Sequence, residues 1–120
     1  MSGKVVHFEL PVQDVDRGKR FWGGVFGWEF GDSAMPDLQY FMVRTGEDQG
    51  GAILPSEDRV TAPIVYFDTD DIDASIAKVK ELGGKTEEKM PIPHVGWFTH
   101  CEDPGGIAFS LFQSDESVTG

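Results

Sequence analysis

The sequence predicts an α+β fold in which two tandem βαβββ units form a curled mixed sheet or half-barrel around a cleft, with the helices on the outer face. Three observations predict this class. Two alternating apolar segments are each followed directly by an acidic turn and a helical pattern. Further strand-like segments follow each helix, separated by turn-rich clusters. The second half of the chain repeats these features in the same order, as a duplicated unit would.

The first unit begins with a strand over residues 5–10, in which apolar and polar side chains alternate. The even-numbered residues are apolar and are predicted to face a helix, so His7 and Glu9 point to the opposite face. Asp14 follows in an acidic turn, where a carboxylate can accept hydrogen bonds from the free N–H groups of a helix start. A helix is therefore expected directly after Asp14.

This helix is predicted to present an apolar face to the core, made of Phe21, Trp22, Val25 and Phe26. Gly23 and Gly24 lie near its end, and a glycine inside a helix costs about 1 kcal/mol relative to alanine. We therefore expect the first helix to be short or frayed at that end.

The second unit begins with a strand over residues 64–68, whose alternation places Tyr66 on the face opposite the helix. Asp71 stands where Asp14 stands in the first unit and is predicted to cap a second helix. That helix should stop at Gly83 and Gly84, because glycine readily adopts the left-handed conformation that ends a helix.

The remaining strands are expected, in chain order, at Trp28–Phe30, Leu38–Arg44, Gly51–Leu54, Thr86–Met90, Trp97–Cys101 and Ile107–Phe112. Placing Asp14 on Asp71 gives a repeat offset of 57 residues, which aligns Ile53 with Ser110 without gaps. The whole chain is then one domain over residues 1–120. Its two units cover about residues 4–58 and 64–114, with a linker at residues 59–63.

Composition excludes several function classes. The 120 residues carry a formal net charge of −11, which would repel a phosphate backbone, so nucleic acid is not an expected partner. The N-terminus has no signal-peptide segment, and no apolar run reaches the roughly 18 residues of a membrane span. A single cysteine, Cys101, fits a reducing compartment. We therefore expect a cytoplasmic protein with no membrane partner.

Motifs spread over nearly the whole chain carry a family resemblance. They are His7-Phe8-Glu9-Leu10, Phe21-Trp22, Phe26-Gly27-Trp28, Asp70-Asp71-Ile72-Asp73-Ala74, Leu82-Gly83-Gly84-Lys85, Asp103-Pro104-Gly105-Gly106 and Phe109-Ser110-Leu111-Phe112. Together they resemble the glyoxalase/bleomycin resistance protein/dioxygenase (vicinal oxygen chelate) superfamily. The resemblance implies a cleft for a small molecule and a homodimer. It does not choose a reaction, because the superfamily includes lyases, isomerases, dioxygenases, thiol transferases and drug-sequestering proteins.

The resemblance also implies where a metal would bind, because metal-dependent members take ligands from the first and last strand of each unit. In this sequence those positions hold His7, Ile53, Ile64 and Ser110. Only His7 is a good ligand type, whereas a catalytic metal normally needs about three protein ligands. The usual metal site is therefore predicted to be lost, and no cofactor is expected. The alternative is one divalent metal ion held by His7 together with Glu9 and His100.

The predicted ligand-binding residues are those that strand alternation or the resemblance places in the cleft: His7, Glu9, Ile53, Tyr66, Ser110 and His100. The leading hypothesis is a glyoxalase-like protein that binds a small molecule without a metal. Two alternatives stay open. One is a lyase or isomerase that uses a rebuilt metal site or His7 and Glu9 as an acid–base pair. The other is a regulatory module that binds a partner protein.

Overall fold

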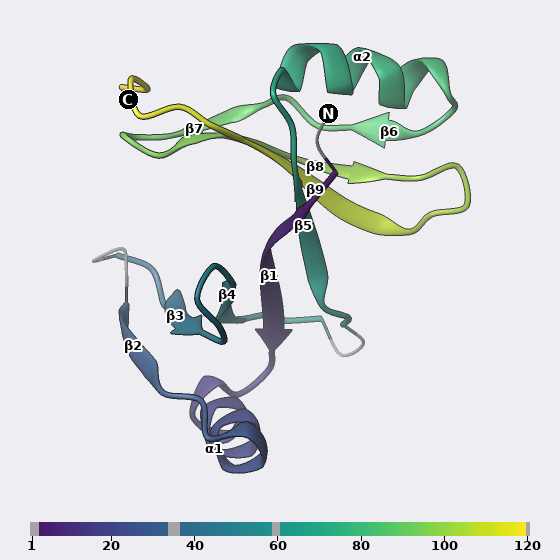
Figure 1. The fold of residues 1–120 in the computed structure, drawn as a ribbon. Helices are drawn as coiled ribbons and strands as arrows, with labels where there is room; N and C mark the ends of the chain where they lie inside the picture. Colours follow the sequence, from purple (N-terminus) through teal and green to yellow (C-terminus); the bar gives the residue numbers. More distant parts are fainter. Residues whose placement is uncertain (1–2, 34–36, 59–60, 120) are drawn as a thin grey trace. The chain divides into compact units, whose positions relative to one another are not determined.

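The computed structural model describes residues 3–33, 37–58 and 61–119, and within them the chain forms nine strands and two helices. The chain divides into two compact units, shown as ribbons in Figure 1. The first unit is Val6–Ile64, and the second combines residues 3–5 with residues 65–119. Arg59 and Val60 of the predicted linker lie outside the described residues.

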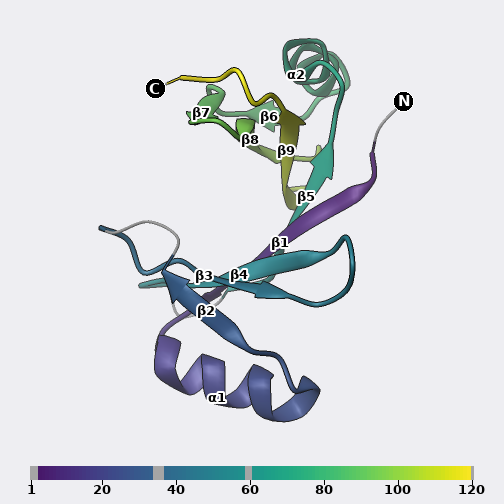
Figure 2. The same ribbon diagram turned by 60° about the vertical axis from the view of Figure 1, so that its left-hand side comes forward.

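The elements of the first unit are β1 (Val5–Val12), α1 (Val15–Phe26), β2 (Phe30–Ser33), β3 (Phe41–Arg44) and β4 (Gly50–Pro55). Its strands lie in the order β2-β3-β4-β1. β1 and β4 are parallel, whereas the other neighbours are antiparallel. Figure 2 shows α1 along one side of these strands. The predicted βαβββ order is therefore present in this unit.

The elements of the second unit are β5 (Ile64–Asp68), α2 (Ile72–Glu81), β6 (Lys85–Thr86), β7 (Met90–Ile92), β8 (Gly96–Glu102) and β9 (Ala108–Ser114). β5 and β9 are parallel, β8 is antiparallel to β9, and both β6 and β7 pair with β8. The single strand predicted at Thr86–Met90 is thus wrong, because β6 ends at Thr86, β7 begins at Met90, and residues 87–89 between them form no strand. The predicted α+β class with mixed pairing is confirmed.

Both helices begin where the acidic turns predict. The Asp14 carboxylate accepts a hydrogen bond from the Arg17 backbone N–H at 3.0 Å. The Asp71 carboxylate does the same with the Ala74 N–H at 3.0 Å. Each aspartate thereby satisfies one of the N–H groups that a helix start leaves without a partner. In the described residues, neither helix is long and apolar enough to cross a membrane.

The end of α1 differs from the prediction. The helix continues through Gly23 and Gly24 to Phe26, and Gly27 ends it in the left-handed conformation at φ 73°. Trp22 packs against the core, but Phe21, Val25 and Phe26 are more than half exposed. Phe21 and Val25 lie to one side of the helix face that carries Trp22. The aromatic face predicted to be buried is therefore buried only in part.

The core of the first unit lies between α1 and the strands. Leu10, Val15 and Ile53 form its buried centre, with Phe8 and Trp22 packed against them. Leu10 and Ile53 are partners in the β1–β4 register, so both point toward the helix. The odd-numbered residues of β1 consequently point away from the helix, as predicted.

The repeat offset of 57 residues holds at the helix starts but not in the last two strands of each unit. Leu111 pairs with Thr99 in the second unit as Ile53 pairs with Phe41 in the first. Leu111 follows Ile53 by 58 residues, and Thr99 follows Phe41 by the same number, so the offset here is 58 residues. Ser110 therefore corresponds to Ala52, and the gap-free alignment of Ser110 with Ile53 is wrong by one residue. A one-residue shift in a strand moves a side chain to the opposite face.

We expect Gly24→Ala to raise the free energy of unfolding by about 1 kcal/mol, because alanine favours a helix. Apart from the adjacent residues and the backbone of the helix itself, no atom lies within 4 Å of the added methyl group. Gly23→Ala is the matched variant, since its methyl group would lie 3.0 Å from the Trp28 carbonyl oxygen. Urea unfolding should show a smaller gain or a loss for Gly23→Ala. Equal stabilisation by both substitutions would contradict this packing.

Candidate ligand site

A chain of polar side chains lies on the face of the first unit that points away from α1. The Tyr40 hydroxyl donates a hydrogen bond to the Glu9 Oε2 atom at 2.7 Å. The same hydroxyl lies 2.7 Å from the His7 Nε2 atom. Glu9 is only 8% exposed, and a buried carboxylate is costly unless it is hydrogen-bonded. We call this arrangement the Glu9–Tyr40–His7 chain.

Strand geometry brings these three residues together. His7 and Glu9 are two residues apart on β1, so they share one face. Tyr40 directly precedes β3, and its backbone N–H donates to the Ser33 hydroxyl at 3.2 Å. This contact ties the start of β3 to the end of β2. Tyr40 is therefore held by its backbone while its hydroxyl reaches the two β1 side chains.

Tyr40 is the functional candidate that the sequence analysis missed. Its position in the strand-like stretch 38–44 carried a signal, because Phe41 and Val43 alternate with Tyr40 and Met42. Phe41 and Val43 pair with residues of the helix-facing side of β4, so Tyr40 has the opposite parity. Strand alternation alone could have placed Tyr40 on the same face as His7.

Burial lowers the pKa of the His7 imidazole below its ordinary value of 6.5, and the nearby Glu9 carboxylate opposes that shift. Desolvation disfavours the charged ring, whereas a negative charge favours it. Because desolvation is the larger effect, His7 is neutral at neutral pH. A neutral imidazole has one nitrogen that donates and one that accepts a hydrogen bond.

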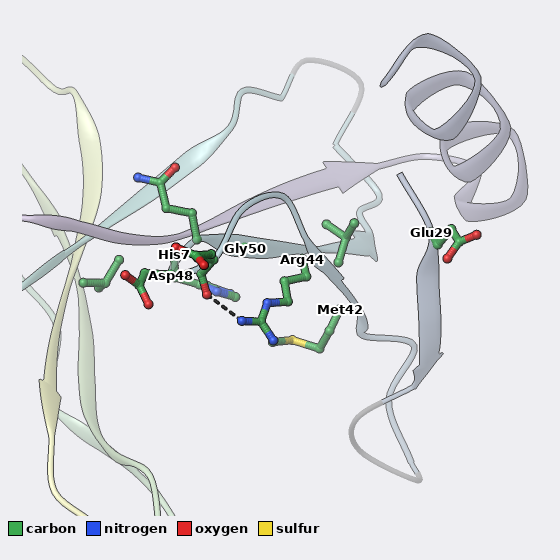
Figure 3. Close-up of a pocket in the computed structure, with 10 residues that line it drawn as sticks. His7, Glu29, Met42, Arg44, Asp48 and Gly50 are labelled. Carbon is green, nitrogen blue, oxygen red and sulfur yellow. Dashed lines mark hydrogen bonds between the residues drawn. The ribbon is translucent and has the colours of Figure 1, made fainter. Parts of the chain in front are cut away.

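His7 also lines a pocket of about 520 Å³ within the first unit, which we call the His7 pocket. Its lining includes His7, Glu29, Met42, Arg44, Glu47 and Asp48. Figure 3 shows His7 close to Asp48 and Gly50, with Glu29 at a distance from them. The charged lining residues are three carboxylates and one guanidinium, so the pocket is acidic on balance.

Arg44 is partly committed to the turn beside this pocket. Its guanidinium donates from Nε to the Gly46 carbonyl at 3.3 Å and from one terminal nitrogen to the Glu47 carbonyl at 2.6 Å. The second of these bonds is drawn in Figure 3. The turn between β3 and β4 is thereby held against the end of β3. Two of the donors that Arg44 could offer a ligand are already used.

The second unit has its own row of side chains on the face away from α2. Tyr66 is the register partner of Ser110, and Ser110 is the register partner of His100. Ser110 is fully buried, and its hydroxyl lies 2.7 Å from the His100 Nδ1 atom. The rings of Tyr66 and His100 meet edge to face with centroids 6.2 Å apart. Three predicted ligand contacts thus lie in one row.

The structure does not support Ile53 as a ligand contact. Its side chain is fully buried in the core beneath α1. A methyl group added at Gly18 of α1 would lie 2.6 Å from the Ile53 Cδ1 atom. The prediction failed because the offset of 57 residues placed Ile53 on the wrong face. Ala52, one residue earlier, shares the face of Glu9 and is its register partner.

The donor atoms do not fit the four-ligand metal site that the resemblance implies. Ala52 and Ile64 have no ligand atom, and the Ser110 hydroxyl is already bonded to His100. No group of three or more histidine, cysteine, aspartate or glutamate side chains in the described parts of the chain could hold a metal ion. His7 and Glu9 belong to one unit and His100 to the other. The loss of the metal site stays a prediction.

Cys101 is a buried core residue of the second unit. It packs with Ile72 and Leu111, and burial together with the Glu87 carboxylate raises the pKa of its thiol to about 11. His100 precedes it in β8, so the two side chains point to opposite faces. Cys101 and His100 therefore do not form a nucleophile and base.

Acidification should destabilise the protein through His7. The unfolded chain protonates this residue near its ordinary pKa of 6.5, whereas the folded chain resists protonation. The free energy of unfolding is therefore expected to fall as the pH drops below 6.5. Urea titrations over a pH series should show a weaker decrease for His7→Asn. The matched control is His94→Asn, which removes an imidazole from an exposed loop. A pH dependence in His7→Asn equal to that of the unmodified protein would contradict this assignment.

Sequence comparisons add relatives to this geometry. A family model described as bleomycin resistance protein-like N-terminal matches residues 4–46. A glyoxylase-like domain-containing protein from Didymella fabae is 28% identical over 121 residues, which cover 92% of this chain and 94% of that protein. A candidate glyoxylase from Mycobacterium bovis is 29% identical over 120 residues. That alignment covers 92% of this chain but only 45% of the mycobacterial protein.

Solved structures share the fold at low sequence identity. A hypothetical protein from Bacillus halodurans aligns with a TM-score of 0.72 and 14% identity, covering all of both chains. A superfamily member from Vibrio splendidus aligns with a TM-score of 0.71 and 18% identity over 93% of this chain and 99% of its own. Methylmalonyl-CoA epimerase from Mycobacterium tuberculosis aligns with a TM-score of 0.68 and 14% identity, covering 94% of this chain and 88% of its own. Sequence matches and fold together confirm the predicted resemblance of this chain to the glyoxalase/bleomycin resistance protein/dioxygenase superfamily.

Proposed function

We propose that this protein binds a small organic molecule in the His7 pocket without the metal site usual in its superfamily. One observation carries the proposal: His7 both lines a pocket of about 520 Å³ and belongs to a hydrogen-bonded chain that ends at a buried carboxylate. Pockets of roughly 300 to 1,000 Å³ with a few fixed polar groups are typical of small-molecule sites.

The burial of Glu9 supports this reading. Replacing a buried carboxylate and its partners by apolar side chains is often neutral or stabilising, so stability alone does not require the Glu9–Tyr40–His7 chain. The β1 positions of His7 and Glu9 could hold uncharged residues, because the corresponding positions of β5 hold Ile64 and Tyr66. A histidine held by a carboxylate through a third group, beside a pocket, is typical of a functional site.

The second unit contributes its own proposed ligand contacts, Tyr66, Ser110 and His100. Tyr66 and the partly buried His100 lie with Phe98 in a cluster of rings whose centroids are 5.5 to 6.5 Å apart. Aromatic faces with one polar group between them suit a ligand that has apolar and polar parts.

A metal-free lyase or isomerase is the second candidate function. The observation that favours it is the continuity of the Glu9–Tyr40–His7 chain, because a neutral histidine oriented by a second group can accept a proton from a substrate. In this reading His7 exchanges the proton, while Tyr40 and Glu9 hold the ring. The methylmalonyl-CoA epimerase among the similar structures shares the fold and does not decide between binding and catalysis.

A screen of small organic fragments by ¹H–¹⁵N NMR tests the proposal. Binding fragments should shift the backbone signals of residues that line the His7 pocket, and His7→Ala should weaken their binding at least about tenfold, as the loss of a central polar contact predicts. His94→Asn is the control. Asparagine suits this position because His94 has φ 63°, which few residues adopt readily.

Two results would contradict the proposal. Fragments whose binding is unchanged in His7→Ala would show that the pocket is not the site. Elemental analysis after dialysis against nickel, zinc, manganese and iron should find no near-stoichiometric metal. Metal that is bound one to one and lost in His7→Ala would instead establish a rebuilt metal centre.

A further inference from the structure

We propose that Ser110 is a positioning residue that keeps the proton of His100 on Nε2, and that this N–H group donates to the carbonyl oxygen of a neutral aromatic ligand. The ligand class rests on the proposed function, because His100 is one of its proposed contacts. The tautomer of His100 concerns the free protein and stands apart from that function.

The burial of Ser110 decides the direction of its hydrogen bond. Ser110 is 0% exposed, and its hydroxyl lies 2.7 Å from the His100 Nδ1 atom, with no other partner among the described residues. A buried hydroxyl hydrogen is costly without an acceptor, so Ser110 donates to Nδ1. A neutral imidazole that accepts at one nitrogen carries its proton on the other. His100 therefore carries its proton on Nε2.

The Nε2–H group of His100 is open to solvent. Within the described residues, no protein group pairs with this nitrogen. The Oγ1 atom of Thr86 is the only completely buried side-chain nitrogen or oxygen in them that lacks a partner, so Nε2 is not completely buried. The ring of His100 thus has one nitrogen bonded inside the protein and one unused donor that a ligand can reach.

Two aromatic rings hold the imidazole in this orientation. The Phe98 ring meets it edge to face with centroids 5.5 Å apart, and the Tyr66 ring does the same at 6.2 Å. A flip of the imidazole would exchange Nδ1 for a carbon atom and break the bond to Ser110. The ring contacts and the hydrogen bond therefore favour one orientation and one tautomer.

The aromatic neighbours of His100 indicate the apolar part of the ligand. Phe98 lies two residues before His100 in β8, so the two side chains share one face. Phe112 of β9 is the register partner of Phe98 and adds a third ring to that face. Phe98 and Phe112 are both partly exposed. An aromatic ligand can pack against these rings while it accepts a hydrogen bond from Nε2.

The charges on this face favour a neutral acceptor. Glu102 follows His100 by two residues, but its register partner is Lys85 of β6, which has the opposite charge. The Asp68 carboxylate accepts hydrogen bonds from two backbone N–H groups of the N-terminal segment at 3.1 and 2.8 Å. A carboxylate ligand would gain no unmatched cation here. A carbonyl oxygen needs only the one donor that His100 offers.

Long-range ¹H–¹⁵N NMR correlations of the histidine side chains test the tautomer in the free protein at mildly alkaline pH. His100 should carry its proton on Nε2. Ser110→Ala removes the donor to Nδ1 and should move the Nδ1 signal of His100, while the signals of His94 in its exposed loop stay in place. A proton on Nδ1, or an Nδ1 signal that Ser110→Ala does not move, would overturn the role of Ser110. The tautomer itself is measured without a substitution, so this test does not depend on the folding of the variant.

Acetophenone and ethylbenzene test the ligand class, because they have nearly the same shape and differ in the carbonyl oxygen. Acetophenone should shift the backbone signals of β8 at about fivefold lower concentration, as one neutral hydrogen bond predicts. His100→Gln keeps an N–H donor near the position of Nε2 and should retain this preference, whereas His100→Phe should lose it. Equal binding of the two probes, or binding of neither, would overturn the ligand class.

Failure of this inference and failure of the proposed function give different results. The proposed function predicts shifts at residues that line the His7 pocket, and these shifts depend on His7. The preference for acetophenone is measured at β8 and depends on His100. A preference that survives in His100→Phe would place the carbonyl contact elsewhere and overturn the inference, whatever the His7 pocket binds.

Discussion

The buried carboxylate of Glu9 is the constraint on which the candidate site depends. At 8% exposure it needs a hydrogen-bond donor, and the Tyr40 hydroxyl supplies one at 2.7 Å. Because Tyr40 directly precedes β3, this hydrogen bond holds the start of β3 near Glu9 of β1. The contact of Tyr40 with Ser33 also holds the end of β2 at this place. The Tyr40 hydroxyl also lies 2.7 Å from the His7 Nε2 atom. The polar face of the first unit is thus organised by one group that cannot be left without a partner.

The two units show how a duplicated scaffold acquires a site. In the first unit Glu9 pairs with Ala52, which pairs with Met42. The corresponding row of the second unit is Tyr66, Ser110 and His100. Tyr66 and Phe98 of the second unit stand at the positions of Glu9 and Tyr40 of the first. They make a ring contact, whereas Glu9 and Tyr40 make a hydrogen bond. The helix-facing positions stay apolar in both units, since Ile53 and Leu111 each lie in a core. The units therefore share their packing and differ in the face that could meet a ligand.

Strand alternation and helix capping made most of the fold predictable from the sequence. The β1 pattern correctly placed His7 and Glu9 together, and Asp14 and Asp71 mark both helix starts. Other features depend on the three-dimensional register. The one-residue shift that separates Ala52 from Ile53 leaves no local signal, and it moved a core residue into the predicted site. Strand alternation carried a signal for the face of Tyr40, but its contacts with Glu9 and His7 depend on how the strands pair.

A double-mutant cycle between Glu9→Gln and Tyr40→Phe tests the central claim most directly. Urea unfolding of both single variants, the double variant and the unmodified protein gives the coupling free energy between the two side chains. If the buried Glu9 carboxylate depends on the Tyr40 hydroxyl, the coupling should be about 1 to 3 kcal/mol, as for hydrogen bonds to charged groups. Effects that simply add would show that these residues do not support one another and would contradict the account.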